Sequence, residues 1–354
     1  MSGLGDASVR DIFNAEAAKR ILITDGAFGT EIQNWKLSEA DYAGTLSLGH
    51  DQKGNNDILA LTKPEVPAAI HRAYFEAGAD IAETNTFSAN RISQADYGAE
   101  ALVREINVES ARLARTIADE FTASDGRPRF VAGAVGPTNK TLSLSPDVND
   151  PGYREIDFDY LKDVYREQID ALVEGGADFV LIETVFDTLN AKAGVMAAIE
   201  AGAALGRDLP IMLSMTLTDL SGRNLSGHTV EAFWHAVRHA RPLTIGLNCS
   251  FGAEQLRPHV KTLSEICDTL IMVYPNAGLP NELGAYDEAP ATTAGLVGQR
   301  AEAGQVNVLG GCCGSTPAHI AAIAQGVRGL APRAVPVPAV RTRLAGLEPF
   351  FMAA

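Results

Sequence analysis

The sequence predicts an α/β protein that folds as one closed (β/α)8 barrel of the TIM type, followed by a C-terminal arm. Short β-rich runs alternate with longer stretches whose apolar residues recur at helical spacing. The β-rich runs are apolar almost throughout, as strands of a parallel sheet must be when helices cover both of its faces. Eight runs of each kind occur, and this number favours a closed barrel over an open, doubly wound sheet.

The expected strands and helices follow one another along the chain, each bounded by a turn or cap signal. The strands are expected at 21–25, 80–84, 130–135, 179–183, 210–216, 244–249, 270–274 and 306–310. The helices are expected at 64–78, 99–121, 158–176, 189–205, 229–240, 254–266, 291–303 and 317–329. Pro64 and the pair Thr316–Pro317 are residues typical of a helix start, which supports the first and last of these helices.

The domain organisation follows from the same pattern. We expect residues 1–330 to form the barrel and residues 331–354, which are rich in proline and alanine, to form a linker or arm. Two connections that follow strands are long, 26–63 and 136–157. Because barrels of this kind carry their chemistry on the loops after the strands, we expect these two loops to lie near the site.

Composition excludes several classes of function. The chain is 46% hydrophobic and 21% charged, and it lacks an apolar stretch long enough to span a bilayer, so a membrane span is not expected. The first twenty residues lack the apolar segment of a secretory signal, and we therefore expect a cytoplasmic protein. A net charge of −15 without a block of Lys or Arg argues against nucleic acid as a partner.

The cysteines indicate a metal site. A disulfide framework does not suit four cysteines in a long chain without secretory features, and CxxC pairs typical of zinc fingers are absent. Cys249 closes the sixth strand in GLNCSFG, and Cys312 and Cys313 close the eighth in LGGCCGST, so all three can converge at one rim of the barrel. Three thiolates with an open fourth position are typical of a catalytic zinc site. The alternative is that they are small buried hydrophobes, which is the interpretation we favour for Cys267, within a helical stretch among apolar neighbours.

Other residues at the same rim suit an amino-acid pocket. Asp25, Gly26, Ala27 and Phe28, with the two residues after them, form a turn whose backbone N–H groups could hold a carboxylate. Carboxylates that could bind an ammonium group end the second and fourth strands, at Glu83 and Glu183. The alternative is an ordinary Asp-Gly turn and glutamates that cap helices. Two histidines, His228 and His235, are expected to be cap or packing residues rather than zinc ligands.

Longer strings of the sequence resemble the homocysteine S-methyltransferase family, and within it the N-terminal homocysteine-binding module of cobalamin-dependent methionine synthase. The resemblance extends over residues 22–319. The strings that carry it are ITDGAFGTEIQ, GADIAETNTFSAN, GAVGPTNKTLSLSPDVNDPGY, GADFVLIETVFDTLNAKA, GLNCSFGAEQLRP, YPNAGLPNELG and GGCCGSTPAHI. Phe28 stands where methionine is common in this family, a departure that leaves the turn intact.

The resemblance implies a role for each candidate residue. It implies that Cys249, Cys312 and Cys313 hold Zn2+ and that the sulfur of homocysteine becomes the fourth ligand. It also implies that Asp25 and Glu183 hold the substrate amino group. Glu83 stays a further candidate because of its position at the end of the second strand. Asn276, in PNAG, stands where the family can offer a weak oxygen ligand in the absence of substrate.

The function expected from this resemblance is an enzyme that binds homocysteine as a zinc thiolate and methylates it to methionine. The methyl group would come from methylcobalamin or methyltetrahydrofolate carried by other modules or partner proteins, and the chain would be either a fragment or a stand-alone subunit. Two alternatives stay open. One is an enzyme that uses S-methylmethionine, S-adenosylmethionine or betaine, and the other is a binding subunit that is inactive without a cobalamin partner.

Overall fold

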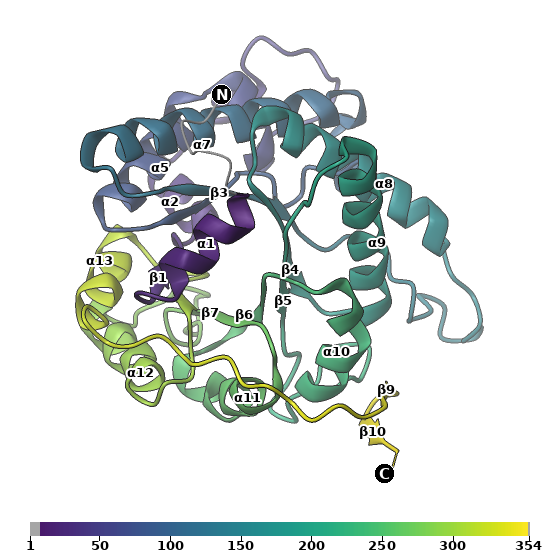
Figure 1. Ribbon diagram of the computed structural model, residues 1–354. Coiled ribbons are helices and arrows are strands. Elements are labelled where there is room, and N and C mark those ends of the chain that lie inside the picture. The colour runs from purple at the N-terminus through teal and green to yellow at the C-terminus, as the bar shows by residue number, and fades with distance from the viewer. Residues whose placement is uncertain (1–7, 353–354) are drawn as a thin grey trace.

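Eight parallel strands form the inner sheet of the computed structural model, which describes residues 8–352 (Figure 1). Their order is β1-β8-β7-β6-β5-β4-β3-β2, and a parallel bridge between Thr24 and Ile81 joins the two ends of the sheet. The predicted (β/α)8 barrel is therefore confirmed. The strands are β1 (Leu22–Ile23), β2 (Ile81–Glu83), β3 (Phe130–Val135), β4 (Phe179–Val185), β5 (Ile211–Met215), β6 (Thr244–Gly252), β7 (Leu270–Asn276) and β8 (Val308–Leu309).

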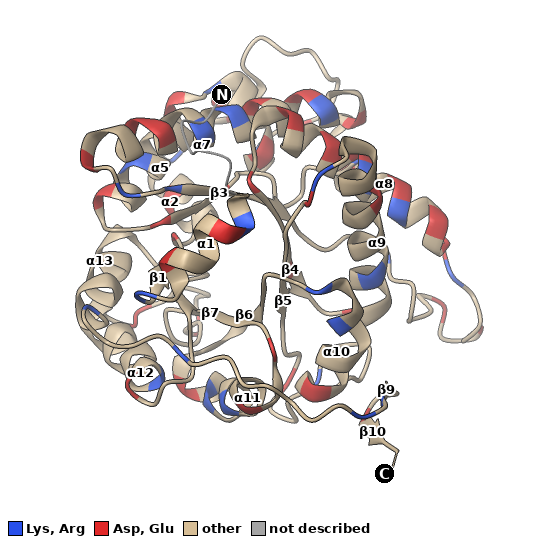
Figure 2. Ribbon diagram, viewed as in Figure 1, with Lys and Arg blue, Asp and Glu red and all other residues tan. Residues whose placement is uncertain are grey.

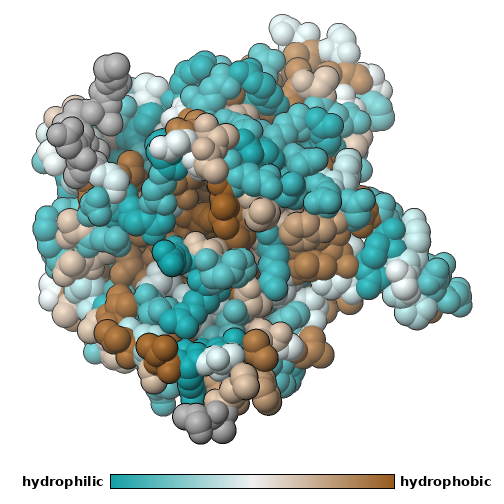
Figure 3. Space-filling model, turned by 45° about the vertical axis from the view of Figure 1, so that its right-hand side comes forward, coloured by the Kyte–Doolittle hydropathy of each residue, from teal (hydrophilic) through white to brown (hydrophobic). Residues whose placement is uncertain are grey.

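Helices cover the outside of the sheet and lie where the apolar periodicity predicts them. They are α5 (Glu65–Glu76), α7 (Val103–Asp125), α8 (Phe158–Gly175), α9 (Thr188–Leu205), α10 (Val230–Val237), α11 (Ala253–Ile266), α12 (Pro290–Glu302) and α13 (Pro317–Gly326). Their outer faces carry the charged residues, as Figure 2 shows along α7 and α8. Figure 3 shows a face on which hydrophilic side chains predominate and apolar ones gather in smaller patches. Every helix among residues 8–352 falls short of what a bilayer crossing requires.

The last strand approaches the first very closely. Leu22 pairs with Val308, Ile23 pairs with Leu309, and the Thr24 N–H donates to Leu309 O at 2.8 Å. A Cβ atom on Gly310 would lie 2.2 Å from Cγ2 of Thr24, so a larger residue would push the two strands apart. Glycine at this position therefore permits the barrel to close.

An additional helix, α1 (Val9–Ala17), crosses the end of the barrel at which the strands begin (Figure 1). The ring of Phe13 is fully buried, and its centroid lies 5.2 Å from that of Phe130 and 5.1 Å from that of Phe179. These two rings stand at the first residues of β3 and β4. The helix thus closes the apolar interior of the barrel at the end opposite to the predicted site.

The two long connections differ in structure. Residues 26–63 contain α2 (Phe28–Asn34), α3 (Glu39–Ala43), a 3-10 turn η1 (Asn56–Ile58) and α4 (Leu59–Thr62). Shorter helical segments follow β2, namely α6 (Arg91–Gln94), η2 (Ala95–Tyr97) and η3 (Glu100–Leu102), and η4 (Arg238–Ala240) follows α10. Residues 136–157 form neither helix nor strand, and Asp187 holds them to the start of α9 by accepting hydrogen bonds from the N–H and hydroxyl of Ser143.

The C-terminal arm is attached to the barrel at both ends. Buried Arg333 donates hydrogen bonds to the carbonyl oxygens of Ser264, Cys267 and Thr269. Farther on, the hairpin of β9 (Arg343–Ala345) and β10 (Pro349–Phe351) packs on α10. The proposed boundary at residue 330 stays a prediction, and residues 1–7 of the predicted barrel domain and 353–354 of the predicted arm lie outside the described residues.

Candidate active site

A cavity of about 530 Å³ opens at the carboxyl ends of the strands. Residues of β2, β4, β6 and β7 and of the loops after β1 and β8 line it. Most of the side chains and turn residues predicted from the sequence meet there, namely Gly26, Ala27, Phe28, Glu83, Glu183, Cys249, Cys312 and Cys313. Asp25 lies behind the cavity wall, and Asn276 lies at the end of β7.

The three rim cysteines converge as the strand order requires. The Sγ atom of Cys313 lies 3.7 Å from that of Cys249 and 4.0 Å from that of Cys312, and all three sulfurs lie within 4.8 Å of one another. An ion bound tetrahedrally at about 2.3 Å from each sulfur would hold the sulfurs about 3.8 Å apart. The cluster therefore has the size that a zinc ion with three thiolate ligands requires.

Protonation within the cluster is uneven. Contacts with the Cys249 and Cys312 thiols lower the pKa of Cys313 to about 3, because both can donate S–H to its sulfur. Contacts with Cys249 and Cys313, together with burial, raise the pKa of Cys312 well above its ordinary value. The sulfur of Cys313 thus ionises readily, while the sulfur of Cys312 needs a nearby cation to ionise.

Irregular backbone at two strand ends positions the site residues. The pairing of β6 with β7 shifts register between Asn248 and Gly252, and Cys249 lies in this bulge with a φ of 60°. The pairing of β4 with β5 shifts between Ile182 and Val185, on either side of Glu183. A left-handed conformation in a residue other than glycine costs about 1–3 kcal/mol, so surrounding contacts must hold it in place.

The side chain of Asn248 supplies those contacts and joins both bulges. It is fully buried, its Nδ2 donates to Thr184 Oγ1 at 2.8 Å, and its Oδ1 accepts from the Thr184 N–H at 3.1 Å. Thr184 has a φ of 53°, which is rare for a β-branched residue. Asn248 Oδ1 also accepts from Ser214 Oγ at 2.6 Å, and Nδ2 lies 3.9 Å from Cys312 Sγ. Sequence reasoning missed Asn248, although it directly precedes Cys249.

The Cys312–Cys313 pair is fixed through its backbone. The Cys312 N–H donates to Pro275 O at 2.8 Å, and Cys313 O accepts from the Ala277 N–H at 2.9 Å. Asn276 lies between these two partners, at the end of β7. Its Oδ1 is buried and has no hydrogen-bond partner among residues 8–352. Such an unpartnered oxygen beside the cysteine pair suits a weak metal ligand.

Three carboxyl groups gather beside the sulfurs. Asp25 and Glu183 are buried and Glu83 is half-buried, and the Glu83 N–H donates to Asp25 Oδ2 at 2.9 Å. Tyr274 donates from its hydroxyl to Glu183 Oε2 at 3.3 Å, and the Thr24 hydroxyl donates to Asp25. The hydrogen-bond partners of these three carboxyl groups are therefore hydroxyl and backbone N–H groups rather than basic side chains.

Burial and mutual repulsion favour the protonated forms of these groups. Burial is the largest cause that raises the pKa of Asp25 and Glu83 well above the ordinary range, and the charge of Glu183 raises both further. Burial, reinforced by Cys249, raises the pKa of Glu183 to about 8. An ammonium group placed among them would favour their ionised forms and form charge-assisted hydrogen bonds.

The turn after β1 differs from the expected one, in which free backbone N–H groups would hold a carboxylate. The Ala27 N–H already donates to Ser315 Oγ at 3.2 Å, and Tyr74 donates from its hydroxyl to Ala27 O at 3.1 Å. A Cβ atom on Gly26 would lie 2.8 Å from Ser315 Oγ, so this position needs glycine. The turn leads into α2, and Phe28 lines the cavity as its first helical residue.

Two further residues of the cavity region escaped the sequence analysis. Asp57, in the long loop after β1, lines the cavity, accepts from the Ser88 N–H at 3.0 Å, and has a pKa raised to about 7 by burial. Tyr286 lies beside the cysteine cluster, and burial, together with the charges of the cysteine sulfurs, raises the tyrosine pKa to about 12. Asp57 lies in the short 3-10 turn η1 and Tyr286 lies outside any helix or strand, so no periodic pattern could indicate them.

The remaining candidates lie elsewhere. The prediction that Cys267 lies within a helix is wrong, because α11 ends at Ile266 and Cys267 has an extended backbone at its C-cap. Its side chain is fully buried, which agrees with the expected packing role. His228 hydrogen bonds with Ser226 Oγ, and His235 lies on α10 with its ring 5.6 Å from that of Phe351.

Comparison with known proteins decides the family. A family model of homocysteine S-methyltransferases matches residues 22–327. The chain belongs to the homocysteine S-methyltransferase family. It is therefore a methyltransferase whose family acts on homocysteine.

Solved structures of one relative share the fold. The metallated form of homocysteine methyltransferase MmuM from Escherichia coli is 24% identical, with a TM-score of 0.68 over 88% of this chain and 98% of that one. The oxidized form is 24% identical, with a TM-score of 0.67 over 86% and 94% of the two chains. The apo form is 23% identical, with a TM-score of 0.63 over 87% and 96%. At this identity the similarity shows a common barrel.

The raised pKa of Glu183 predicts a stability effect. The folded state binds this proton more tightly than the unfolded chain, whose glutamate pKa is near 4.5. The resulting stability is therefore present below pH 4.5 and is lost as pH rises toward about 8. Replacing Glu183 with Gln should remove this loss and raise the free energy of unfolding at pH 8 by on the order of 4 kcal/mol.

Urea unfolding of both proteins without substrate between pH 5 and pH 9 measures this effect. Glu302→Gln, at an exposed position on α12, is the matched control and should follow the parent curve. Parallel pH curves for the parent and Glu183→Gln would mean that Glu183 is ionised in the folded protein.

Proposed function

We propose that this protein methylates homocysteine to methionine at a zinc site formed by Cys249, Cys312 and Cys313. The observation that carries the proposal is the convergence of three sulfur atoms beside a group of buried carboxyls in one cavity. The sulfurs suit the thiol end of homocysteine and its metal, while the carboxyls suit its ammonium end.

The donor set favours zinc at this position. Three soft thiolates at tetrahedral spacing leave a fourth position open, and the unpartnered Oδ1 of Asn276 is an oxygen that can occupy that position without substrate. Zinc bound there would supply a Lewis acid that lowers the pKa of a thiol bound at its open position. The cytoplasm is the compartment we propose, because neighbouring free thiols persist in a reducing environment.

The protein's own residues would orient the substrate. Glu183 and Asp25 are proposed to receive the ammonium group, with Glu83 next to both. Because burial raises the pKa values of these carboxyls, an ammonium group placed between them would favour their ionised forms. The first turn of α2 at Phe28 lines the same cavity and is proposed to receive the substrate carboxylate.

The loops that follow the strands offer contacts for a methyl donor carried by another module or protein. Loops that follow the strands expose large apolar side chains, with fractional exposures of 93% for Leu283, 91% for Val148 and 78% for Leu220. These side chains are available to contact a carrier protein. The resemblance of the sequence to the cobalamin-dependent branch of the family favours methylcobalamin or methyltetrahydrofolate on a partner module over a small donor such as S-methylmethionine, S-adenosylmethionine or betaine.

The zinc assignment predicts about one zinc per chain. Cys249→Ala and Cys312→Ala should each lose most of the metal, because two thiolates bind the ion far more weakly than three. Metal analysis of the purified proteins measures this, with Cys267→Ala as the control that retains its zinc. Full zinc occupancy in both rim variants would refute the assignment.

The orientation role predicts that Glu183→Gln weakens homocysteine binding without loss of zinc. Removing one carboxylate from a buried charge pair should cost about 2–5 kcal/mol of binding free energy. Calorimetric titration with homocysteine, and with a thiol of the same length that lacks the amino group, measures the affinity and the discrimination between the two. Unchanged affinity for homocysteine would mean that the ammonium is held elsewhere, with Glu83 the next candidate.

The donor is tested by measuring methionine after incubation of the protein with homocysteine, zinc and each candidate donor in turn. We expect turnover with methylcobalamin, faster when a protein carries it, and a Leu283→Ser, Val148→Ser variant should lose only the increase due to the carrier. Turnover with S-methylmethionine, S-adenosylmethionine or betaine alone would favour the small-donor alternative. Turnover that requires the carrier absolutely would favour a binding subunit.

A further inference from the structure

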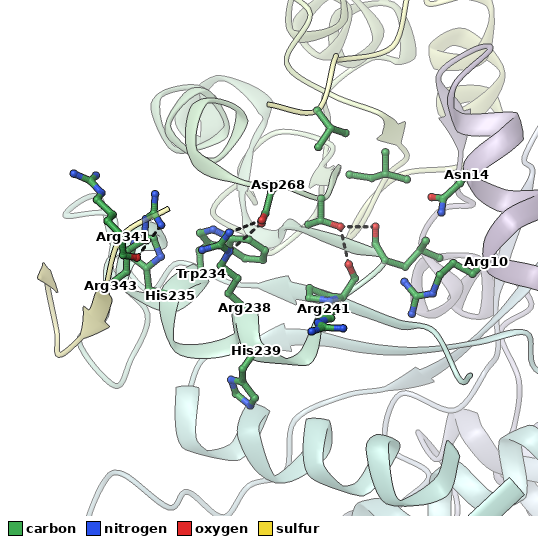
Figure 4. Close-up of a pocket in the computed structure, with 15 residues that line it drawn as sticks. Arg10, Asn14, Trp234, His235, Arg238, His239, Arg241, Asp268, Arg341 and Arg343 are labelled. Atoms are coloured by element: carbon green, nitrogen blue, oxygen red, sulfur yellow. Dashed lines mark hydrogen bonds and ion pairs between the residues drawn. The ribbon is translucent and has the colours of Figure 1, made fainter. Parts of the chain in front are cut away.

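A second cavity, of about 900 Å³, lies at the other end of the barrel (Figure 4). It is bounded by α1, by α10 and η4, and by the residues that lead into β6 and β7. The C-terminal arm supplies its remaining wall through Val335, Arg341 and Arg343. We call this cavity the arm groove. The proposed function uses none of its residues.

The arm groove is basic, although the chain as a whole carries a net charge of −15. Five arginines line it, and Asp268 is the acidic residue that lines it together with them. In Figure 4, Arg341 and Arg343 lie at one end and Arg10 at the other, with Arg238 and Arg241 between them. The positive charges are therefore spread along the length of the groove.

Two of these arginines are neutralised by carboxylates, and three are not. Arg238 pairs with Asp268, and Arg10 pairs with Asp208 at 2.6 Å. The guanidinium of Arg341 stacks on a phenyl ring, 3.9 Å from its centroid, and Arg343 donates to the Ala339 carbonyl at 2.8 Å. Within residues 8–352, the ion pairs leave Arg241, Arg341 and Arg343 without a carboxylate.

Buried polar atoms in the same wall also lack partners. Trp234 is almost fully buried, and its Nε1–H has no acceptor among the described residues. Both ring nitrogens of His235 likewise form no hydrogen bond in that part of the chain. Burial, together with the charges of Arg343, Arg238 and Arg341, lowers the pKa of His235 to about 4. The three guanidinium charges thus add to the effect of burial on this histidine.

We propose that the arm groove binds a small molecule that carries a diphosphate or two separate phosphate groups. Phosphate suits the donors because guanidinium forks bind phosphate oxygens in pairs. Three uncompensated positive charges match the roughly three negative charges of a diphosphate group near neutral pH. Such a ligand would contact the barrel through Arg241 and the arm through Arg343.

The position of the arginines gives the ligand a second effect. Because Arg341 and Arg343 belong to the arm while Arg238 and Arg241 belong to the barrel, an anion between them bridges the two parts. Binding should therefore hold the arm against α10 and protect residues 334–343 from proteolysis.

Calorimetric titration of inorganic pyrophosphate into the full chain at low salt tests the proposal. We expect one saturable site, with affinity reduced about tenfold or more in Arg241→Gln and in Arg343→Gln, because each loses charge-assisted hydrogen bonds. Arg104→Gln is the matched control, since this arginine lies on α7 and pairs with Glu174. It removes the same charge and should keep the parent affinity.

Three results would overturn the proposal: absence of saturable binding, equal affinity in all variants, or tighter binding of citrate than of pyrophosphate. The second would indicate only diffuse attraction, and the third would indicate a polycarboxylate ligand. A trypsin digest supplies an independent measurement, in which pyrophosphate should slow cleavage in the arm of the parent but not of Arg241→Gln. Because Arg241 is exposed, this variant should fold normally.

Discussion

The contact between the first and last strands is the constraint on which the site depends. β1 and β8 share only a short ladder, and this ladder forms because Gly310 leaves room for Thr24. Closure places the Gly311 N–H against Asp25 O at 3.2 Å, so residues from the two ends of the barrel sequence meet. The carboxyl group after β1 and the cysteine pair after β8 can share one cavity only because of this contact.

The sequence predicted the parts of the molecule that follow from repetition. Apolar runs located all eight strands, and the rule that parallel strands end at one rim predicted that Cys249 would meet Cys312 and Cys313. The left-handed conformations of Thr184 and Cys249 could not be predicted, because they run against the local preference of these residues. They exist because Asn248 holds both strand ends, and such a contact between distant segments leaves no periodic signal in the sequence.

The two ends of the barrel have separate tasks. α1 and the arm cover the end at which the strands begin, where Phe13 completes the apolar interior and Arg333 fastens the arm. The other end keeps buried carboxyls and three neighbouring thiols, which a purely structural barrel would replace with apolar residues. This division is typical of enzymes, in which a stable scaffold tolerates a site that is less than optimally stable.

The Asn248 side chain also has a consequence for substrate choice. It contacts Thr184, which follows Glu183, and approaches Cys312 Sγ, so the ammonium end and the sulfur end of the proposed site are fixed to one rigid amide. This contact therefore fixes the distance between the group that binds the ammonium and the group that binds the sulfur of an amino thiol. Cysteine is one methylene shorter than homocysteine, and a single methylene can change discrimination by about 10–200-fold. In the proposed function, the barrel would thus select the length of the substrate through this fixed distance, without a side chain that touches the carbon atoms of the substrate.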